Sequence, residues 1–440
     1  MRKIYIETYG CQMNLSDSEI VASVLSQEGF STTEDIHQAD IILLNTCSIR
    51  DHAEQRIKKR LQQLRAMKRK RRDLVIGLLG CMAGRIQSVL AEEEPLIELV
   101  SGPDSYRDLP QLIQQVESGQ RAINTILSIE ETYADITPVR IGSNGVSAFV
   151  SIMRGCENFC SYCVVPFVRG KERSRSADSI IREIEKLFTE GYREVVLLGQ
   201  NVNSYRWPED DTGLDFAGLL DQVARISPQL RIRFATSHPK DLSARLLETI
   251  ALNPNICRAI HLPVQSGSNR ILHRMNRQYT REDYMERIDA IRRLIPGCTI
   301  STDIITGFCD ETEEDHALTL SLMKSAAFDY AFMFSYSERP QTLAAETLQD
   351  NVPSLIKERR LREVIDLQHQ ISQQSNRKDL GKIVEVLVEG ESKRLATNFM
   401  GRTSGNKVVV FPRQHSHPGD YIRVKIIRCT SATLIGEICT

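Results

Sequence analysis

Short apolar runs alternate with amphipathic stretches along roughly the first 130 residues. The apolar runs predict buried parallel strands at residues 3–9, 40–44 and 74–79. Between the last two, apolar side chains recur at spacings of four, four, three and three, which is one face of a helix: Ala53, Ile57, Leu61, Leu64 and Met67. This alternation predicts an open parallel α/β domain over residues 1–130.

A longer alternation of strand and helix patterns follows. Six strands are predicted, at residues 148–153, 194–199, 231–236, 259–264, 299–305 and 330–334. One intervening helix is predicted at 178–189, and another begins at Thr280, with Asp283 placed to complete a capping box. Six strand–helix units are too few for a closed eight-stranded barrel. We therefore expect a (β/α)6 partial TIM barrel over residues 142–375.

The sequence pattern changes in the last part of the chain. A long charged helix is predicted at residues 352–379, and short β-rich runs follow at 383–388, 395–399, 408–411 and 421–427. Such runs are typical of a small five-stranded all-β barrel, OB-like, of the kind that binds oligonucleotides. We place this domain at residues 376–440, so the whole chain is predicted to be a multidomain α/β protein.

Composition narrows the class of protein. The chain has 440 residues, 41% of them hydrophobic and 26% charged, and it contains eleven cysteines. We find no signal-peptide pattern and no apolar run near the roughly 18 residues of a membrane span, so we expect a cytoplasmic protein that does not enter a membrane. A reducing compartment keeps cysteines as thiols available for metal. The net charge of −1 means that RNA contacts would need local basic patches.

Three cysteines carry the strongest chemical signal. Cys156, Cys160 and Cys163 form a C-x3-C-x2-C triplet directly after a predicted strand. Three thiolates can hold three irons of a 4Fe–4S cube, and the fourth iron is then open to a small molecule, whereas structural metal sites are usually closed by four protein ligands. The alternative interpretations are a zinc knuckle that lacks one ligand, or three buried core cysteines.

A second set of cysteines is scattered in sequence. Cys11, Cys47 and Cys81 each follow the end of a predicted buried strand. The carboxyl ends of parallel strands lie at one edge of a sheet, so the three thiols should converge there. The alternative is three unrelated buried cysteines. The remaining cysteines are predicted to be structural: Cys257, Cys298, Cys309, Cys429 and Cys439.

The triplet, with Tyr162 just before its third cysteine, resembles the signature of the radical S-adenosylmethionine (SAM) superfamily. Over nearly its whole length the chain also resembles the MiaB-type branch of the radical SAM methylthiotransferases, which ends in a TRAM domain. The resemblance rests on Tyr9-Gly10-Cys11-Gln12-Met13-Asn14, Asn45-Thr46-Cys47-Ser48-Ile49-Arg50, Cys163-Val164-Val165-Pro166-Phe167-Val168-Arg169-Gly170 and Gly199-Gln200-Asn201-Val202-Asn203-Ser204-Tyr205.

This resemblance implies the cofactors and the reaction. It implies two 4Fe–4S clusters, a radical SAM cluster on Cys156, Cys160 and Cys163 and an auxiliary one on the other set, so that all six cysteines are catalytic. One SAM would donate a methyl group and another would yield a 5′-deoxyadenosyl radical. Together they would methylthiolate C2 of N6-isopentenyladenosine, next to the anticodon of tRNA.

The resemblance also implies partners. The partners would be the tRNA anticodon stem-loop, an electron donor such as flavodoxin or ferredoxin, and a sulfur donor, and we expect a monomer. We expect SAM contacts mainly at strand ends: Tyr162, Gly199, Gln200, Thr236, Gln265 and Asp303. RNA contacts are predicted after the cluster loop and on a loop of the small barrel: Arg169, Lys171, Arg173, Arg175, Phe399, Arg402 and Asn406. The alternatives for these residues are packing, helix capping or a solvated loop. The basic run 56–72 is a further candidate for RNA contact, and its alternative is a solvated helix face.

Two other functions stay open from the sequence. The same chemistry could act on another substrate, either a differently modified tRNA adenosine or a ribosomal protein, but the residues beside Cys11 and Cys47 argue against this. An iron–sulfur RNA-binding redox sensor without catalysis is the other alternative. The open position at the cysteine triplet argues against it, because a sensor needs no vacant site of SAM size.

Overall fold

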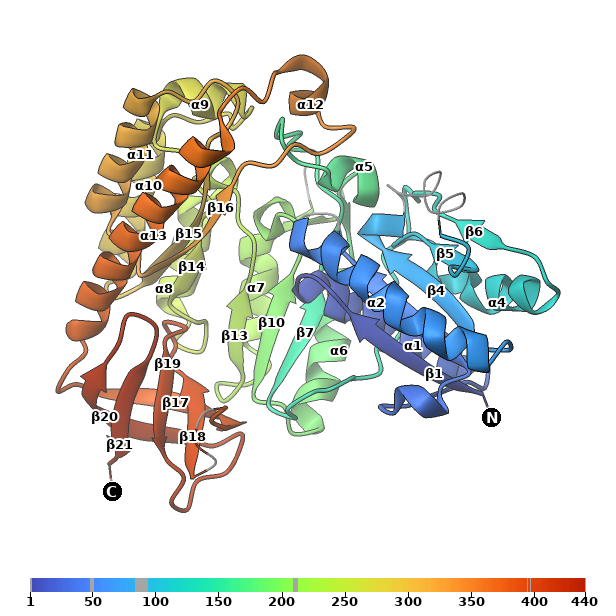
Figure 1. The fold of residues 1–440 in the computed structure, drawn as a ribbon. Coiled ribbons are helices and arrows are strands. Elements are labelled where there is room, and N and C mark those ends of the chain that lie inside the picture. The colour runs from blue at the N-terminus through green and yellow to red at the C-terminus, as the bar shows by residue number, and fades with distance from the viewer. Residues whose placement is uncertain are drawn as a thin grey trace.

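The computed structural model describes residues 2–47, 51–83, 94–208, 213–393, 395 and 397–439. Three parts lie along the chain (Figure 1). In the described N-terminal part, six parallel strands form one sheet in the order β2-β1-β3-β4-β5-β6, which confirms the predicted open parallel α/β fold. The elements are β1 Lys3–Thr8, α1 Gln12–Gln27, β2 Ser31–Thr32, β3 Ile41–Thr46, α2 Asp51–Lys70, β4 Val75–Gly80, β5 Leu99–Ser101, α4 Leu109–Glu117 and β6 Ala122–Asn124.

Alternate side chains of this sheet enter two cores. Ile41 and Leu43 of β3 pack with α1 and α4, whereas Ile42 and Leu44 pack with α2 through residues such as Leu61. Both faces of β3 and β4 are therefore buried, which is why these strands read as continuous apolar runs. Because both faces are buried, polar functional side chains are expected at the carboxyl ends of the strands.

The central part is the predicted partial barrel. Six parallel strands follow one another in space as in sequence, in two sheets β7-β10-β13 and β14-β15-β16, and a bridge from Ile232 to Ile256 extends β13 toward β14. The strands are β7 Ser147–Ser151, β10 Glu194–Leu198, β13 Arg231–Phe234, β14 Ala259–His261, β15 Thr299–Thr306 and β16 Tyr330–Ser335. The short strands are β8 Met153–Arg154, β9 Arg173–Ser174, β11 Arg206–Trp207 and β12 Leu214–Asp215.

Helices cover the outer face of these strands (Figure 1). They are α6 Ala177–Thr189, α7 Phe216–Ala224, α8 Ala244–Leu252, α10 Arg281–Leu294, α11 Glu313–Ala326 and α13 Ser354–Arg377, with shorter α5 Val165–Arg169, α9 Asn269–Arg274 and α12 Leu343–Thr347 at the carboxyl end of the barrel. Thr280 caps α10 and forms the predicted capping box with Asp283. The other side of the strands forms the concave face of the barrel.

The C-terminal part is a closed β-barrel, as predicted. In its described residues the strands close in the order β17-β18-β19-β21-β20: β17 Ile383–Glu391, β18 Asn398–Arg402, β19 Val408–Pro412, β20 Tyr421–Cys429 and β21 Leu434–Ile438. The four β-rich runs did not include β21, whose Gly436 and Glu437 weaken the strand pattern. Pairing with both β19 and β20 makes it a strand.

The small barrel docks at the amino ends of the central strands. Arg231 and Arg233, on β13, donate to the carbonyls of Arg402 and Thr403 at 2.7 and 2.6 Å. Thr299, at the start of β15, donates to the carbonyl of Gly405 at 2.6 Å. The small barrel therefore sits at the end of the central domain opposite the strand carboxyl ends. Among the helices described, none is long and apolar enough to cross a membrane.

Candidate functional site

The cysteine triplet lies on a tight loop between β8 and α5. Gly155, just before Cys156, has φ +81°, and a Cβ there would lie 1.8 Å from the Lys171 carbonyl oxygen, so only glycine fits. The Cys156 amide donates to Gly170 at 3.2 Å and the Cys163 amide to Cys160 at 2.9 Å. The loop is thus folded back on itself, with its three thiols held near one another.

A buried arginine lies beside this triplet. Burial, with a smaller contribution from the neighbouring cysteines, raises the pKa of Cys156 to about 11 and that of Cys163 to about 12. Arg277 lies 3.2 Å from the Cys160 sulfur through its Nη1 atom. It is itself fixed by the Pro263 carbonyl at 2.8 Å and the Tyr279 hydroxyl at 2.7 Å. Arg277, which the sequence did not reveal, therefore offsets negative charge on this set.

The second cysteine set converges as its strand positions predict. Cys11 caps α1, Cys47 follows β3 and Cys81 follows β4. A Cβ on Gly10 would lie 2.7 Å from the Cβ of Cys47, so the two chain segments approach as closely as a glycine permits. A hydrogen bond from Cys47 lowers the pKa of Cys11 to about 6, against the effect of burial. The set therefore contains a thiol that ionises readily.

Cys81 ties the N-terminal domain to the cluster loop. Burial raises the pKa of Cys81, and the charge of Arg169 opposes that rise. Val164 and Val168 pack against Cys81, and the Arg169 Nε atom lies 3.1 Å from its sulfur. All three side chains come from α5 or the residue before it, directly after Cys163. The short segment from Cys163 to Arg169 therefore begins with a cysteine of the triplet and ends in contact with Cys81 of the second set.

The N-terminal domain also lies against the concave face of the barrel. Cys11 and Met13 pack with Val196 and Leu198 of β10 and with Phe149 of β7. Their neighbours along β10, Val195 and Leu197, face the outer helices instead. Both cysteine sets are therefore placed at the same opening of the barrel.

The donor chemistry of both sets fits iron–sulfur clusters. Within the described residues, no three His, Cys, Asp or Glu side chains are spaced to hold a single metal ion. Each set instead offers three thiols, the ligands that iron–sulfur clusters take, and an arginine donates to one sulfur in each. Because burial keeps Cys156 and Cys163 protonated, loading would release protons.

The predicted SAM contacts gather at the carboxyl ends of the strands. The side-chain oxygens of Gln200 and Gln265 are buried with no hydrogen-bond donor among the described residues. Gln265 and Thr236 have positive φ, and the backbone N–H of Gln265 donates to the backbone carbonyl of Asp303 at 2.9 Å. Buried acceptors without donors favour a polar ligand at this end.

Two further candidates pack around the triplet. A Cβ on Gly199 would lie 2.5 Å from the Met153 side chain, so this position has no room for a larger residue. The Tyr162 hydroxyl lies 3.5 Å from Arg277 Nη1, and its ring packs edge-on against Phe308. Gly199 therefore packs against β8, the strand before the triplet loop, whereas Tyr162 lies in the loop itself.

The concave face of β14–β16 carries aromatic side chains that sequence analysis did not single out. Phe332 and Phe334 are 49% and 39% exposed, whereas Met333 between them packs into the outer core. His261 lies 3.4 Å from Asp303 and edge-on to Phe332. The alternation Tyr330, Phe332, Phe334 was the available signal, but only the barrel shows which face is solvent-exposed.

Three predicted RNA contacts are buried instead. Arg169, Arg173 and Arg175 pair with Asp17, Asp104 and Glu183, respectively, and no more than 5% of each residue is exposed. Their charges join elements of the interior, and a phosphate could not reach them without breaking these pairs. This placement argues against the predicted phosphate contacts, and Lys171 is the exposed cation of the segment.

The predicted RNA loop of the small barrel is likewise engaged. Phe399 lies in the barrel core and is 2% exposed, so it cannot stack on a base. Arg402 pairs with Glu389 at 3.1 Å, and Asn406 donates to the Tyr330 hydroxyl at 3.1 Å. The loop joins the two domains. On helix α2, Arg60 and Arg65 of the basic run also pair with acids, while other cations there stay exposed.

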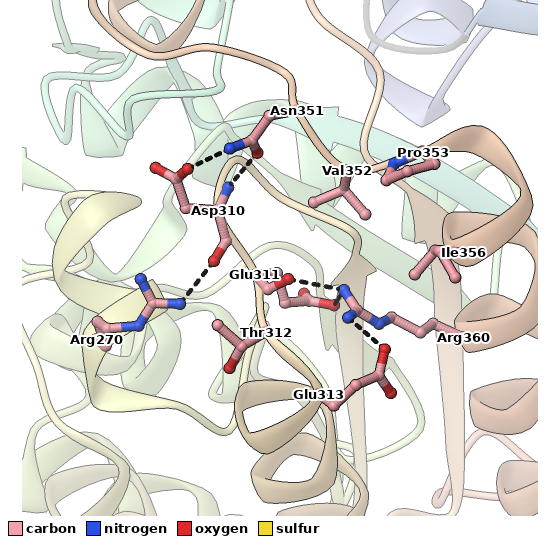
Figure 2. A pocket seen from close by; sticks show the side chains of 10 residues that line it. All are labelled: Arg270, Asp310, Glu311, Thr312, Glu313, Asn351, Val352, Pro353, Ile356 and Arg360. Carbon is pink, nitrogen blue, oxygen red and sulfur yellow. Dashed lines mark hydrogen bonds and ion pairs between the residues drawn. The ribbon is translucent and has the colours of Figure 1, made fainter.

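A cavity of about 580 Å³ opens between the loop after β15 and the start of α13 (Figure 2). Its charged residues pair with one another: Arg360 bonds Glu311 at 2.9 Å and Glu313 at 2.7 Å, and Asn351 accepts from the Asp310 amide at 2.9 Å. These bonds clamp α13 to the barrel. None of the six cysteines is among the described residues that line the cavity.

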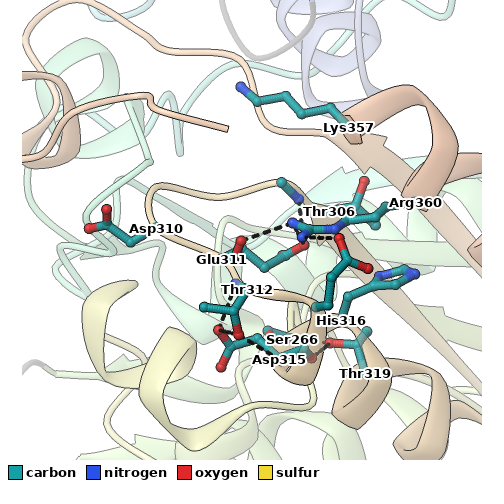
Figure 3. A network of polar contacts seen from close by, with 12 residues as sticks. Ser266, Thr306, Asp310, Glu311, Thr312, Asp315, His316, Thr319, Lys357 and Arg360 are labelled. Atoms are coloured by element: carbon teal, nitrogen blue, oxygen red, sulfur yellow. Dashed lines mark hydrogen bonds and ion pairs between the residues drawn. The ribbon is translucent and has the colours of Figure 1, made fainter. Parts of the chain in front are cut away.

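An adjoining polar network braces the turn that follows Gln265 (Figure 3). Asp315 accepts from Ser268 at 2.5 Å and from Arg270, and the Thr319 hydroxyl accepts from the Gly267 amide at 3.0 Å. The network supports a candidate SAM residue without containing it.

Comparison with known proteins matches all three parts. The profile described as uncharacterized protein family UPF0004 matches residues 3–102, the radical SAM superfamily matches 150–323, and the TRAM domain matches 377–439. The radical SAM match implies a 4Fe–4S cluster and SAM, and the UPF0004 match is consistent with a second cluster.

Curated relatives match the chain over its full length. The tRNA-2-methylthio-N(6)-dimethylallyladenosine synthase of Amoebophilus asiaticus (strain 5a2) is 56% identical, covering 100% of this chain and 93% of the relative. The enzyme of the same name from Chloroherpeton thalassium is 55% identical, over 99% and 96%.

Solved structures support the fold alone. The radical SAM methyltransferase TsrM from Kitasatospora setae aligns with a TM-score of 0.59 at 15% identity, over 78% of this chain and 75% of that one. The cobalamin-dependent SAM radical enzyme OxsB aligns at 0.56 and 13%, over 83% and 56%. With full-length relatives above half identity and all three domains in order, this chain belongs to the MiaB-type family of radical SAM methylthiotransferases.

Proposed function

We propose that this enzyme is a tRNA-2-methylthio-N6-dimethylallyladenosine synthase, which adds a methylthio group to C2 of N6-isopentenyladenosine in tRNA. The observation that carries the proposal is the convergence of two three-thiol sets, from two domains, at one opening of the barrel. The full-length relatives of that name support the substrate.

The reaction explains why two cysteine sets are needed. The C2–H bond of adenine is neither acidic nor electrophilic, so acid–base groups of the chain cannot insert sulfur there. When bound, the cluster of the triplet with SAM supplies a carbon radical, and the second cluster supplies the sulfur site. The chain's own part is to hold, orient and seal these groups.

The proposed ligands divide between the domains. Cys156, Cys160 and Cys163 would hold the radical SAM cluster, and Cys11, Cys47 and Cys81 the auxiliary one. Arg277 would stabilise the thiolate of Cys160 by a charge-assisted hydrogen bond. Tyr162, Gly199, Gln200, Thr236, Gln265 and Asp303 remain the proposed SAM residues. The buried oxygens of Gln200 and Gln265 support this, because they would accept from the amino group or the ribose.

The substrate base would lie on the concave face between the two sets. Phe332 and Phe334 offer exposed apolar surface there, which suits the isopentenyl group. Adenine would have to leave the stack of the anticodon loop to reach it. His261 and Asp303 provide polar partners beside the rings.

The rest of the tRNA would contact basic surface of the small barrel. On β20, Arg423 and Lys425 are exposed, and within the described residues neither has an ion pair. Their buried neighbours Val424 and Ile426 face inward, so the cations share the outer face. Because this barrel lies at the amino ends of the central strands, it would bind a part of the tRNA that is distant from the reacting base.

The remaining partners follow from the same proposal. An electron donor such as flavodoxin or ferredoxin and a sulfur donor would be required, and the protein would act as a monomer in the cytoplasm, where tRNA is its substrate. We propose domain limits of 1–130, 142–375 and 376–440, which contain the three matched regions.

The decisive test is anaerobic. Protein reconstituted with iron and sulfide is mixed with dithionite, SAM and isopentenylated tRNA, and the digested nucleosides are analysed by mass spectrometry. We expect 5′-deoxyadenosine together with the methylthio adduct of isopentenyladenosine. Release of 5′-deoxyadenosine with unchanged tRNA would refute the substrate, and absence of both with roughly eight irons bound would favour a sensor.

A further inference from the structure

One arginine bridges the two halves of the site. Arg169 ends α5, whose preceding residues include Cys163, and its Nε atom lies 3.1 Å from the sulfur of Cys81 in the other domain. Its Nη2 atom pairs with Asp17 of α1 at 2.7 Å. The side chain is 3% exposed, so water does not screen these contacts.

The surroundings fix this arginine in position. Asp17 is fully buried, and its second oxygen pairs with Arg154 at 3.0 Å. Val164 and Val168 pack on Cys81 beside it. A third nitrogen, Nη1, is buried and has no acceptor among the described residues. The arginine is therefore held in place, with its Nε donor directed at Cys81, its Nη2 donor at Asp17, and Nη1 without an acceptor among the described residues.

We infer that Arg169 is a positioning residue for the Cys11, Cys47 and Cys81 cluster, which holds the Cys81 sulfur across the domain interface and raises the reduction potential of that cluster. The inference rests on the proposed function, since it takes this set to carry the auxiliary cluster. A reduced cluster carries one more negative charge than an oxidised one. A buried cation bonded to its ligand stabilises the reduced form more strongly.

The same geometry gives α5 a mechanical role. The helix begins two residues after Cys163 and ends at Arg169. Its length therefore sets how far the triplet lies from the second set. A change at Arg169 should disturb the second cluster, and SAM cleavage at the triplet much less.

The test compares Arg169→Met and Arg169→Lys with Arg140→Met. Arg140 is a matched control because it also joins α1 to the central domain, through Glu19 and Glu183 at 2.6 Å each. Its hydrogen bonds and ion pairs within the described part of the chain involve no cysteine. Each full-length protein is reconstituted anaerobically and titrated with reductant while electron paramagnetic resonance is recorded. Addition of SAM identifies the signal of the triplet cluster, because SAM binds there.

We expect the second cluster of Arg169→Met to titrate at a more negative potential than that of the wild type. Arg169→Lys should shift less because it keeps the charge, and Arg140→Met should not shift. Selective loss of the second cluster's iron from Arg169→Met would also support the inference. Equal potentials and iron contents in Arg169→Met, Arg140→Met and the wild type would overturn it.

If Arg169→Met does not fold, Arg169→Gln takes its place because it also removes the charge, and an unshifted potential in Arg169→Gln overturns the inference. This result is separate from the proposed function. That function fails only if wild-type enzyme forms no methylthio adduct, whatever the potentials are.

Discussion

Arg277 lies 3.2 Å from the sulfur of Cys160, although 117 residues separate them in sequence. Arg169 makes the matching contact to Cys81, so each thiol set has one buried arginine on a sulfur. Buried thiolates without a nearby cation would be costly to form. The two arginines therefore prepare sites that must hold several negative charges.

Replacing Arg277 should slow SAM cleavage. Arg277→Met removes a hydrogen bond to a charged sulfur, a loss of about 1.5–3 kcal/mol, or roughly ten- to 100-fold in rate if it acts on the reacting state. The measurement is the rate of 5′-deoxyadenosine formation with excess dithionite. Arg258→Met, at the amino end of β14, should leave the rate unchanged. An equal loss in both variants would refute the role of Arg277.

Removing one ligand from each set should separate the two halves of the reaction. Cys81→Ala should lose about half of roughly eight irons yet still form 5′-deoxyadenosine, whereas Cys156→Ala should form none. Iron analysis and nucleoside analysis check both outcomes. Cys257→Ala, a buried cysteine outside both sets, should retain all the iron. Full iron in Cys81→Ala would contradict the ligand assignment.

Asp17 should stabilise the folded chain in a pH-dependent way. Burial raises its pKa, but Arg154 and Arg169 outweigh burial, and the net pKa lies below its ordinary value of 3.8. Asp17→Asn removes the ion-pair partner of Arg169 and one of the two carboxylates beside Arg154, which keeps Asp104 at 3.6 Å. It should cost about 3–5 kcal/mol of unfolding free energy at pH 7.

A depressed carboxyl pKa stabilises the fold above the unfolded pKa, and this stabilisation is lost as the pH falls through the folded value. The difference in unfolding free energy between wild type and Asp17→Asn should therefore be constant above about pH 5 and shrink below pH 3.8. Urea unfolding of both proteins across this range measures it. A difference that grows on acidification would contradict the assignment.

Phe334 should contribute to substrate recognition. Phe334→Ala removes exposed apolar surface from the concave face, and losing about 1.5 kcal/mol of burial against the isopentenyl group predicts roughly a tenfold fall in kcat/KM. Steady-state kinetics with isopentenylated tRNA provide the measurement. Met333→Ala, on the opposite face of β16, should lower thermal stability and leave KM unchanged. An unchanged kcat/KM in Phe334→Ala would contradict binding of the isopentenyl group on this face.

Arg423 and Lys425 should bind tRNA through phosphates. Replacing both by alanine should weaken tRNA binding. It should also reduce the slope of the logarithm of the binding constant against the logarithm of salt concentration by about one per lost phosphate contact. Filter binding at several salt concentrations measures this slope. Phe399→Ala should instead destabilise the small barrel by about 3–5 kcal/mol, since it empties a core position. An unchanged slope in the double variant would place the RNA elsewhere.

Local residue patterns were sufficient to predict those site residues whose positions depend only on where strands end. Cys11, Cys47 and Cys81 converge because each follows a buried parallel strand, and such ends share one edge of the sheet. Likewise, the alternation of strands and helices determined the partial barrel. The strand β21 was missed because its pattern is weak and only pairing with two neighbours stabilises it.

Which charged side chains and aromatic rings are exposed could not be predicted from the residue patterns. Arg169, Arg173 and Arg175 read as a basic loop, yet acids from distant segments bury and neutralise them. Phe399 belongs to a core, and Phe334 is exposed, although both occur in similar β patterns. The two thiol sets and the family could be predicted from residue patterns, because these depend on spacing along the chain. The partners of each charge depend on contacts between distant segments, which only the folded chain brings together.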